Sequence, residues 1–225
     1  MNSGEPNINR LLKLLSEYMA ATDTSDLNRV TTMMHDLEKT SMGSDVTRHL
    51  MNDKQLAQMF ERKWVPRKIS VEELKRHPKS TTGKALYHYY TAAKINKIDN
   101  PYTTERFKSK QAFVHARMRE THDLLHVITG FDPNGAGEVA LATFCLFQHR
   151  TVSSAFIIFG ALMENIAKGK PIEIYLKAIE KGVAMANGCK LIISYQIEDW
   201  LDKDLNDVRV DLGVHNPHTN RVDLG

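Results

Sequence analysis

Two histidines one helical turn apart are the residues best suited to chemistry in this sequence. His122 and His126 occupy positions i and i+4 of a segment whose apolar residues recur with helical spacing. At about 100° per residue, this spacing places both imidazoles on one side of a helix, where they can reach a common metal ion. Asp123 adjoins the first histidine, and Glu138 follows the second after eleven residues. Two histidines plus one carboxylate, with open positions, are typical of a catalytic rather than a closed structural site.

The segment that must position these histidines is predicted to be a long helix, from about Thr104 to Ile128. One face of it is apolar and is expected to point into the core. A polar arc with His122 and His126 borders that face. A glycine-rich loop over 129–137 then lets the chain reverse, which is expected to bring Glu138 back toward His126. The apolar face consists of Val114, Met118, Leu125 and Ile128, and the arc also holds His115, Arg119 and Asp123.

The pattern alone leaves alternatives open. Histidines at this spacing also occur as ordinary surface or capping residues of a helix. Asp123 is expected either to bind the ion directly or to orient a histidine. A His-Asp metal phosphohydrolase would need a further histidine and a further aspartate, which His88 and Asp199 could supply, although no spacing demands it. His149 lies about 16 Å along the helix from Glu138, so we exclude it as a direct ligand.

The residues around the histidines resemble the coenzyme Q biosynthesis protein 4 family. His122-Asp123-x-x-His126, eleven residues and then Glu138 match the H-D-x-x-H-x11-E signature of that family. Segments 67–90 and 195–214 are similar to two further family segments, so the resemblance covers roughly residues 65–213. The sequence departs from the family at 77–80, where His-Pro-Lys-Ser replaces Leu-Pro-x-Gly. Without a visible mitochondrial presequence, we interpret the chain as a divergent, bacterial-type relative.

The resemblance implies an all-helical protein of isoprenoid-quinone biosynthesis. It implies a divalent ion, usually given as zinc, at His122, Asp123, His126 and Glu138, while the donor atoms would also accept iron, manganese or magnesium. The leading hypothesis is a metal-dependent protein that acts on a polyprenylated aromatic acid and takes part in oxidative removal of its ring carboxyl. The alternative from another class is a non-catalytic prenyl-lipid carrier or scaffold for other quinone-biosynthesis proteins.

Two apolar stretches, 138–149 and 153–167, are consistent either with a buried core or with a channel for a prenyl chain. The candidate channel residues are Phe144, Phe147, Phe156, Phe159 and Leu162. Candidate residues for holding an anionic head group or for moving a proton are His115, Arg117 and Arg119. The aromatic cluster of Tyr87, Tyr89 and Tyr90 is more typical of core packing than of substrate stacking.

The composition of the chain argues against several classes of partner and location. The chain has 225 residues with 30 Lys and Arg against 27 Asp and Glu, and a net charge of +3 gives no reason to expect nucleic acid as a partner. Cys145 and Cys189 are expected to be reduced thiols. The longest apolar run, 155–163, is too short for a membrane span of about 20 residues. We expect a cytoplasmic homo-oligomer that contacts the inner face of a membrane peripherally.

The fold is predicted to be all-α. Helices are expected over 52–62, after Ser70 with Glu73 as a capping box, and after Thr81 or Thr82. Further helices are expected over 138–150, 153–167, 171–187 and 191–212. The expected division is an N-terminal helical segment (1–62), a family-like core with the metal site (63–213) and a flexible tail (214–225). His215 and His218 in this tail are interpreted as solvated residues rather than a metal pair.

Overall fold

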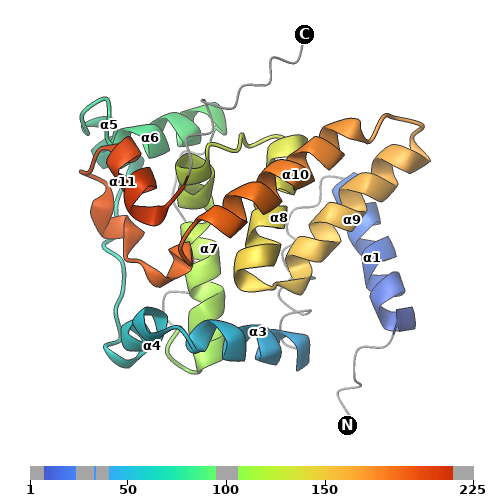
Figure 1. Ribbon diagram of the computed structural model, residues 1–225, viewed down its shortest axis with the longest axis horizontal. Coiled ribbons are helices and arrows are strands. Elements are labelled where there is room, and N and C mark those ends of the chain that lie inside the picture. Colours follow the sequence, from blue (N-terminus) through green and yellow to red (C-terminus); the bar gives the residue numbers. More distant parts are fainter. Residues whose placement is uncertain (1–7, 24–32, 34–40, 95–105, 215–225) are drawn as a thin grey trace. The chain divides into compact units, whose positions relative to one another are not determined.

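The structure is a computed structural model that describes residues 8–23, 33, 41–94 and 106–214 (Figure 1). Within these ranges it is helical and contains no strand. A single isolated antiparallel bridge joins Thr81 to Asp204 in this part of the chain. The all-α prediction is therefore confirmed. By its contacts the chain divides into two compact units, Met1–Leu50 with Gly135–Val183, and Met51–Asn134 with Ala184–Gly225.

The first unit is built around the pair of helices α8 and α9, with α1 packed on α9. Tyr18 of α1 and Phe156 of α9 are buried together in its core. Gly160 allows this approach, because a Cβ atom there would lie 2.6 Å from Cε1 of Tyr18. The elements are α1 (Ile8–Asp23), α8 (Gly135–His149) and α9 (Val152–Ala167), with most of α3 (Ser41–Met51) and α10 (Glu173–Gly188).

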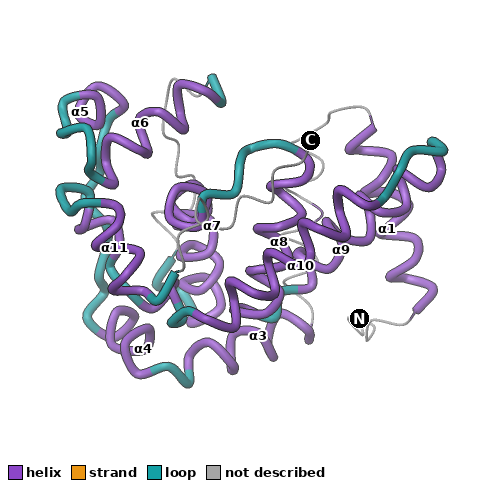
Figure 2. Tube along the Cα trace, turned by 45° about the horizontal axis from the view of Figure 1, so that its top comes forward, coloured by secondary structure: helices purple, strands orange, loops and turns teal. Residues whose placement is uncertain are grey.

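The second unit is centred on α7, which contacts α6, α11 and two short 3-10 helices, η1 and η2 (Figure 2). A buried arginine, Arg117, fixes this arrangement by pairing with Glu198 of η2. The remaining contacts join α5 to α6 and α4 to η1. The elements are α4 (Lys54–Glu61), α5 (Val71–Lys75), α6 (Thr82–Ala92), α7 (Lys110–Thr129), η1 (Ile192–Ser194), η2 (Ile197–Trp200) and α11 (Leu205–Leu212).

Helix starts are confirmed where the sequence offers a capping side chain. Asp53 accepts hydrogen bonds from the backbone N–H groups of Gln55 and Leu56 at the start of α4. Ser70 and Glu73 form the predicted reciprocal capping box of α5. Thr81, rather than Thr82, caps α6. Such local signals are enough to predict where a helix begins, because a cap satisfies backbone donors that the first helical turn leaves without partners.

Three predicted boundaries were wrong. Residues 106–109 form a turn, and α7 begins at Lys110 after the cap of Ser109. The glycine-rich loop is shorter than expected, because α8 already begins at Gly135. The segment 191–212 is not one helix but η1, η2 and α11 in succession. In this last case the carbonyl groups of Ile193 and Tyr195 accept hydrogen bonds from Arg117 instead of continuing a helical ladder.

The division at residues 62 and 213 stays a prediction, and residues 215–225, including His215 and His218, lie outside the described residues. No described helix is long and apolar enough to cross a membrane. Cys145 and Cys189 are free thiols, and burial raises the pKa of each to about 12.

Candidate metal centre

The two histidines of the signature lie on the second half of α7, whose ends are both fixed. At the start, the Ser109 hydroxyl accepts a hydrogen bond from the N–H of Ala112 (3.0 Å). At the end, Gly130 adopts φ 74°, a left-handed conformation that favours glycine. Arg209 of α11 donates hydrogen bonds to the carbonyls of Val127 and Ile128, which lie in the last turn. The register of His122 and His126 is therefore fixed from both sides.

The imidazoles of His122 and His126 lie close together, with ring centroids 4.9 Å apart. His126 is buried and His122 is exposed. Nδ1 of His126 lies 2.8 Å from the carbonyl oxygen of Phe131. A carbonyl only accepts, so Nδ1 carries the proton of the neutral ring, and the lone pair of Nε2 is the one that could bind a metal. This is the arrangement in which metal-binding histidines are normally held.

Glu138 completes a group of three possible ligands. One ligand atom from each of His122, His126 and Glu138 lies within 4.8 Å of the other two. Glu138 sits in the first turn of α8, and its negative charge contributes to raising the pKa of Cys145 and of Tyr18, after burial. This is the one such group of His, Cys, Asp or Glu side chains within the described part of the chain. The donor set could hold a divalent metal ion.

Asp123 has a different place from the other signature residues. It is not in the three-residue group, and its Oδ1 lies 3.2 Å from Nδ1 of His122. Tyr89 donates a long hydrogen bond of 3.5 Å to the same oxygen, and Tyr90 also bonds to the carboxylate. Burial acts to raise the pKa of Asp123, but hydrogen bonds from His122 and Tyr90 and nearby positive charge lower it overall. The geometry favours a carboxylate that orients His122.

Tyr89 is the residue of this site that sequence reasoning did not identify. Its ring stacks on that of His126, with centroids 5.3 Å apart and an interplanar angle of 25°. Its neighbour Tyr90 is buried, as core packing predicts, and burial is the largest cause that raises the pKa of its phenol. Adjacent tyrosines on one helix signal little beyond packing. Only the contact of α6 with α7 shows that Tyr89 touches the histidine.

The candidate head-group residues have unlike surroundings. Arg119 is exposed and His115 is partly buried. Arg117 is completely buried; it pairs with Glu198 and its guanidinium lies 5.0 Å from the ring centre of Trp64. These contacts give Arg117 a structural role in the second unit. Neither His88 nor Asp199, which the phosphohydrolase alternative would need, belongs to the three-residue group.

The candidate channel residues of α8 and α9 do not share one environment. Phe144 and Phe156 are buried, Leu162 is partly buried, and Phe147 and Phe159 are exposed. His149 is buried in the first unit, where it lies near His49 and outside the three-residue group.

Comparisons with known proteins agree with the signature. The sequence model of coenzyme Q (ubiquinone) biosynthesis protein Coq4 matches residues 6–218, so the likeness extends well upstream of the motif-based resemblance. A protein of Komagataella phaffii named ubiquinone biosynthesis protein COQ4, mitochondrial, is 29% identical over 154 residues, which are 66% of this chain and 49% of that protein. The protein of the same name from Vanderwaltozyma polyspora is 25% identical over 199 residues, 82% of this chain and 52% of that protein.

The chain thus spans about half the length of the curated relatives it matches. A crystal structure from Nostoc punctiforme, of a protein named for ubiquinone biosynthesis, superposes with a TM-score of 0.79 at 21% identity. The match covers 93% of this chain and 99% of that one, and at this identity it establishes the shared fold. With the family match over nearly its whole length, the chain belongs to the Coq4 family of coenzyme Q (ubiquinone) biosynthesis proteins.

Proposed function

We propose that this chain is a metal-dependent protein of isoprenoid-quinone biosynthesis that binds a polyprenylated aromatic acid with its polar head at His122, His126 and Glu138. The observation that carries the proposal is the proximity of these three ligand groups. Family membership supports the pathway, and the tautomer of His126 set by Phe131 supports a metal-binding role for this histidine.

Different residues of the site have different proposed roles. A divalent ion, zinc by family resemblance, would supply Lewis acidity toward the carboxylate or phenolate of the ring. Phe131 and Asp123 orient the two imidazoles, and Tyr89 covers one face of His126. Exposed Arg119 is the candidate partner for an anionic head group, and His115 the candidate for moving a proton. The reaction we infer is removal of the ring carboxyl.

A carrier or scaffold remains the alternative function for the same site. In that case the ion would hold the head group while the prenyl chain is presented to other quinone-biosynthesis proteins. Exposed apolar side chains of α9, such as Phe159 and Met163, favour contact with a lipid or a partner. We infer a peripheral association with a membrane surface and self-association as further properties of the protein.

The first prediction tests the metal centre. Replacing His126 with Gln or Glu138 with Gln is expected to lower bound metal at least tenfold, because each change removes one of three ligands. Metal content of the purified protein is measured by mass spectrometry, and quinone output by complementation of a deletion strain. Glu164→Gln is the matched control, a carboxylate of α9 that pairs with Lys168 outside the group.

The two readouts separate the alternatives. Loss of both metal and quinone output supports a metal that the function needs. A His126 variant without metal that still restores quinone output contradicts a catalytic metal and favours a scaffold that works without the ion. Full metal content and full output in Glu138→Gln would contradict the proposed site. Mass spectrometry of an organic extract of protein prepared without detergent adds a direct check, since a carrier or a lipid enzyme should retain a prenyl compound.

A further inference from the structure

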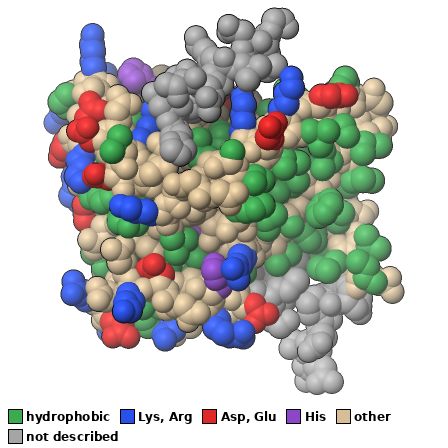
Figure 3. All heavy atoms as spheres, in the orientation of Figure 1, with side chains coloured by type: hydrophobic (Ala, Val, Ile, Leu, Met, Phe, Trp, Pro, Cys, Tyr) green, Lys and Arg blue, Asp and Glu red, His purple; other side chains and the backbone are tan. Residues whose placement is uncertain are grey.

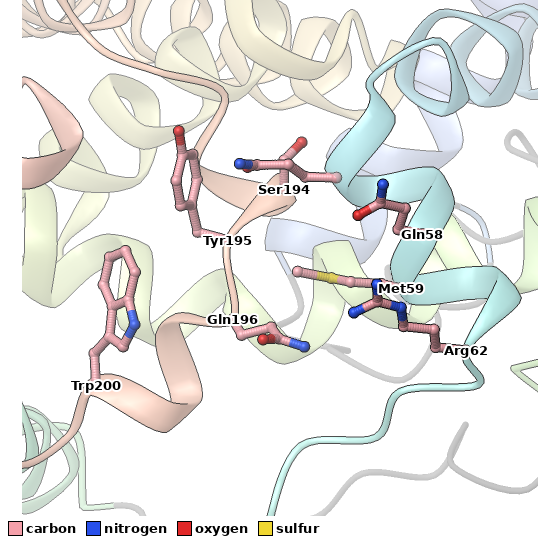
Figure 4. A pocket seen from close by; sticks show the side chains of 8 residues that line it. Gln58, Met59, Arg62, Ser194, Tyr195, Gln196 and Trp200 are labelled. Carbon is pink, nitrogen blue, oxygen red and sulfur yellow. The ribbon is translucent and has the colours of Figure 1, made fainter.

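The second unit contains a pocket that shares no residue with the metal centre. It lies between α4 and the segment around η1 and η2, and its cavity volume is about 230 Å³ (Figure 4). This is below the range of sites for drug-sized ligands, about 300–1,000 Å³, so the pocket suits a ligand about the size of one aromatic ring. The lining residues are Gln55, Gln58, Met59, Arg62, Ser194, Tyr195, Gln196 and Trp200.

The pocket combines one positive charge with two aromatic rings that are tilted against each other. Arg62 is the charged residue of the lining, and it forms no ion pair with any described residue. The rings of Tyr195 and Trp200 lie 5.8 Å apart at 54°. Outside the lining, Lys203 Nζ lies 4.2 Å from the ring centre of Trp200 and is paired with Asp211 at 3.6 Å, so the positive charge of the pocket comes from Arg62. A ligand that fits is therefore anionic and planar.

The backbone of the pocket wall that faces α4 is held by hydrogen bonds from the buried Arg117. Arg117 donates hydrogen bonds to the carbonyls of Ile193 (3.2 Å) and Tyr195 (2.9 Å), the residues on either side of Ser194. Arg117 also pairs with Glu198, so this carboxylate is already neutralised. A site whose backbone is fixed before binding loses little conformational entropy when a ligand arrives.

The pocket wall contains one buried polar atom whose hydrogen-bonding capacity is not used by any described residue. The Ser194 hydroxyl oxygen is buried and has no hydrogen-bond partner within the described part of the chain. Such a group normally finds a partner in water or in a ligand. Figure 4 shows Arg62 and Gln196 extending from opposite sides toward the space between α4 and the loop. Polar groups on both sides can thus hold one ligand.

We propose that this pocket binds a small planar organic carboxylate. The guanidinium of Arg62 matches the two oxygens of one carboxylate, and the amides of Gln58 and Gln196 supply further donors. The body of the ligand packs on Tyr195 and Trp200. A single guanidinium suits one carboxylate better than a phosphate group, which usually calls for several donors and cations.

Benzoate is the probe, and the indole signals of the ¹⁵N-labelled full chain are the readout. The chain has two tryptophans, so two indole signals are expected, and Trp200→Phe assigns them. Benzoate should shift the Trp200 signal saturably, with a dissociation constant of about 1 mM or tighter, and leave Trp64 unchanged. Uncharged benzamide should bind at least about tenfold more weakly, because it lacks the charge that Arg62 recognises.

Two substitutions complete the test. Arg62→Gln, at the exposed C-cap of α4, should weaken benzoate binding at least about tenfold. Arg76→Gln is the matched control, because Arg76 is the C-cap of α5 and does not line the pocket. The proposal is overturned if benzoate gives no saturable shift, if benzamide binds equally well, or if Arg62→Gln binds benzoate as the wild type does.

Discussion

Histidines in this chain serve different purposes, and the neighbours of each ring decide which. His126 has its Nδ1 fixed by the carbonyl of Phe131, which prepares the other nitrogen for a metal. His77 pairs instead with Asp202 at 3.0 Å. His149 is buried, and Nε2 of its ring has no hydrogen-bond partner among the described residues. A buried imidazole without an acceptor is stable only as the neutral form.

The environment of His149 predicts a pH dependence of stability. Burial, and next to it the charge of His49, lower the pKa of His149 to about 4. Between the unfolded value near 6.5 and about 4, the unfolded state binds more protons than the folded state. The free energy of unfolding should therefore fall as the pH drops through this window, by up to about 3 kcal/mol, and this contribution should level off below pH 4.

Urea unfolding between pH 7.5 and about 4 measures this dependence. His149→Gln should flatten the slope because it removes the titrating group, whatever it does to stability at pH 7. His88→Gln is the control, since His88 is exposed. If the His149 variant keeps the wild-type slope, the dependence has another origin.

The part of the candidate site that depends on spacing along one helix was predictable from the sequence. Two histidines at i and i+4 must lie on one side of α7, and a carboxylate after a short turn can return to them. The part played by Tyr89 was not predictable, because 34 residues separate it from Asp123 and only tertiary packing brings them together. The pocket at Arg62 and Trp200 was missed for the same reason.

At the scale of elements, the backbone conformation at the end of α7 sets the position of a residue that orients His126. Gly130 ends the helix with φ 74°, and the next residue, Phe131, supplies the carbonyl that accepts the hydrogen bond of His126. A residue with a Cβ atom at this φ is strained. A change at Gly130 should thus disturb the proposed metal centre without altering any of its proposed ligands.

Gly130→Ala is expected to lower the free energy of unfolding by about 1 kcal/mol and to weaken the binding of zinc, used here as the probe ion for the proposed centre. The matched control is Gly169→Ala, because Gly169 has φ 62° and nothing within 4 Å of an added Cβ atom. The control should lose similar stability yet keep its zinc affinity. Stability is measured by urea unfolding and affinity by competition with a chromogenic chelator. Equal zinc affinities in the two variants would contradict a positioning role for this turn.

The helices of the fold were predictable where apolar periodicity and a capping residue agree, as in α4, α5 and α6. The prediction of one helix over 191–212 was wrong, although the apolar residues of this segment also recur at short intervals. There Ile192, Ile193 and Ile197 are all buried, and Arg117 takes carbonyls that a helix would need. A sequence window cannot show that an arginine more than 70 residues away competes for the backbone.

At the scale of the whole chain, each unit combines segments distant in the sequence, and no local pattern predicts such a division. The surface of the first unit carries an exposed apolar set, which we define as Phe159, Met163, Ile166, Ile174 and Leu176. Figure 3 shows hydrophobic side chains gathered over α9 and α10. Water-exposed apolar side chains in such a cluster are typical of surfaces that contact a lipid or another protein.

The exposed Lys170, between α9 and α10, lies next to this set and favours an anionic lipid surface as its partner, whereas the charge of Lys168 is paired with Glu164. Replacing Phe159, Met163 and Ile166 together with Gln should lower binding to vesicles of mixed neutral and anionic lipids about tenfold or more, because three apolar side chains no longer enter the interface.

Vesicle flotation measures this binding, and the triple variant should still fold, since these side chains are 58%, 46% and 56% exposed. Val210→Gln is the control, an apolar side chain of α11 that is 77% exposed but lies in the second unit. A triple variant that floats like the wild type would exclude this face from membrane contact. If it instead loses self-association in sedimentation while keeping vesicle binding, the apolar set is an interface between copies of the chain, because the same burial that would anchor it in lipid then stabilises a dimer.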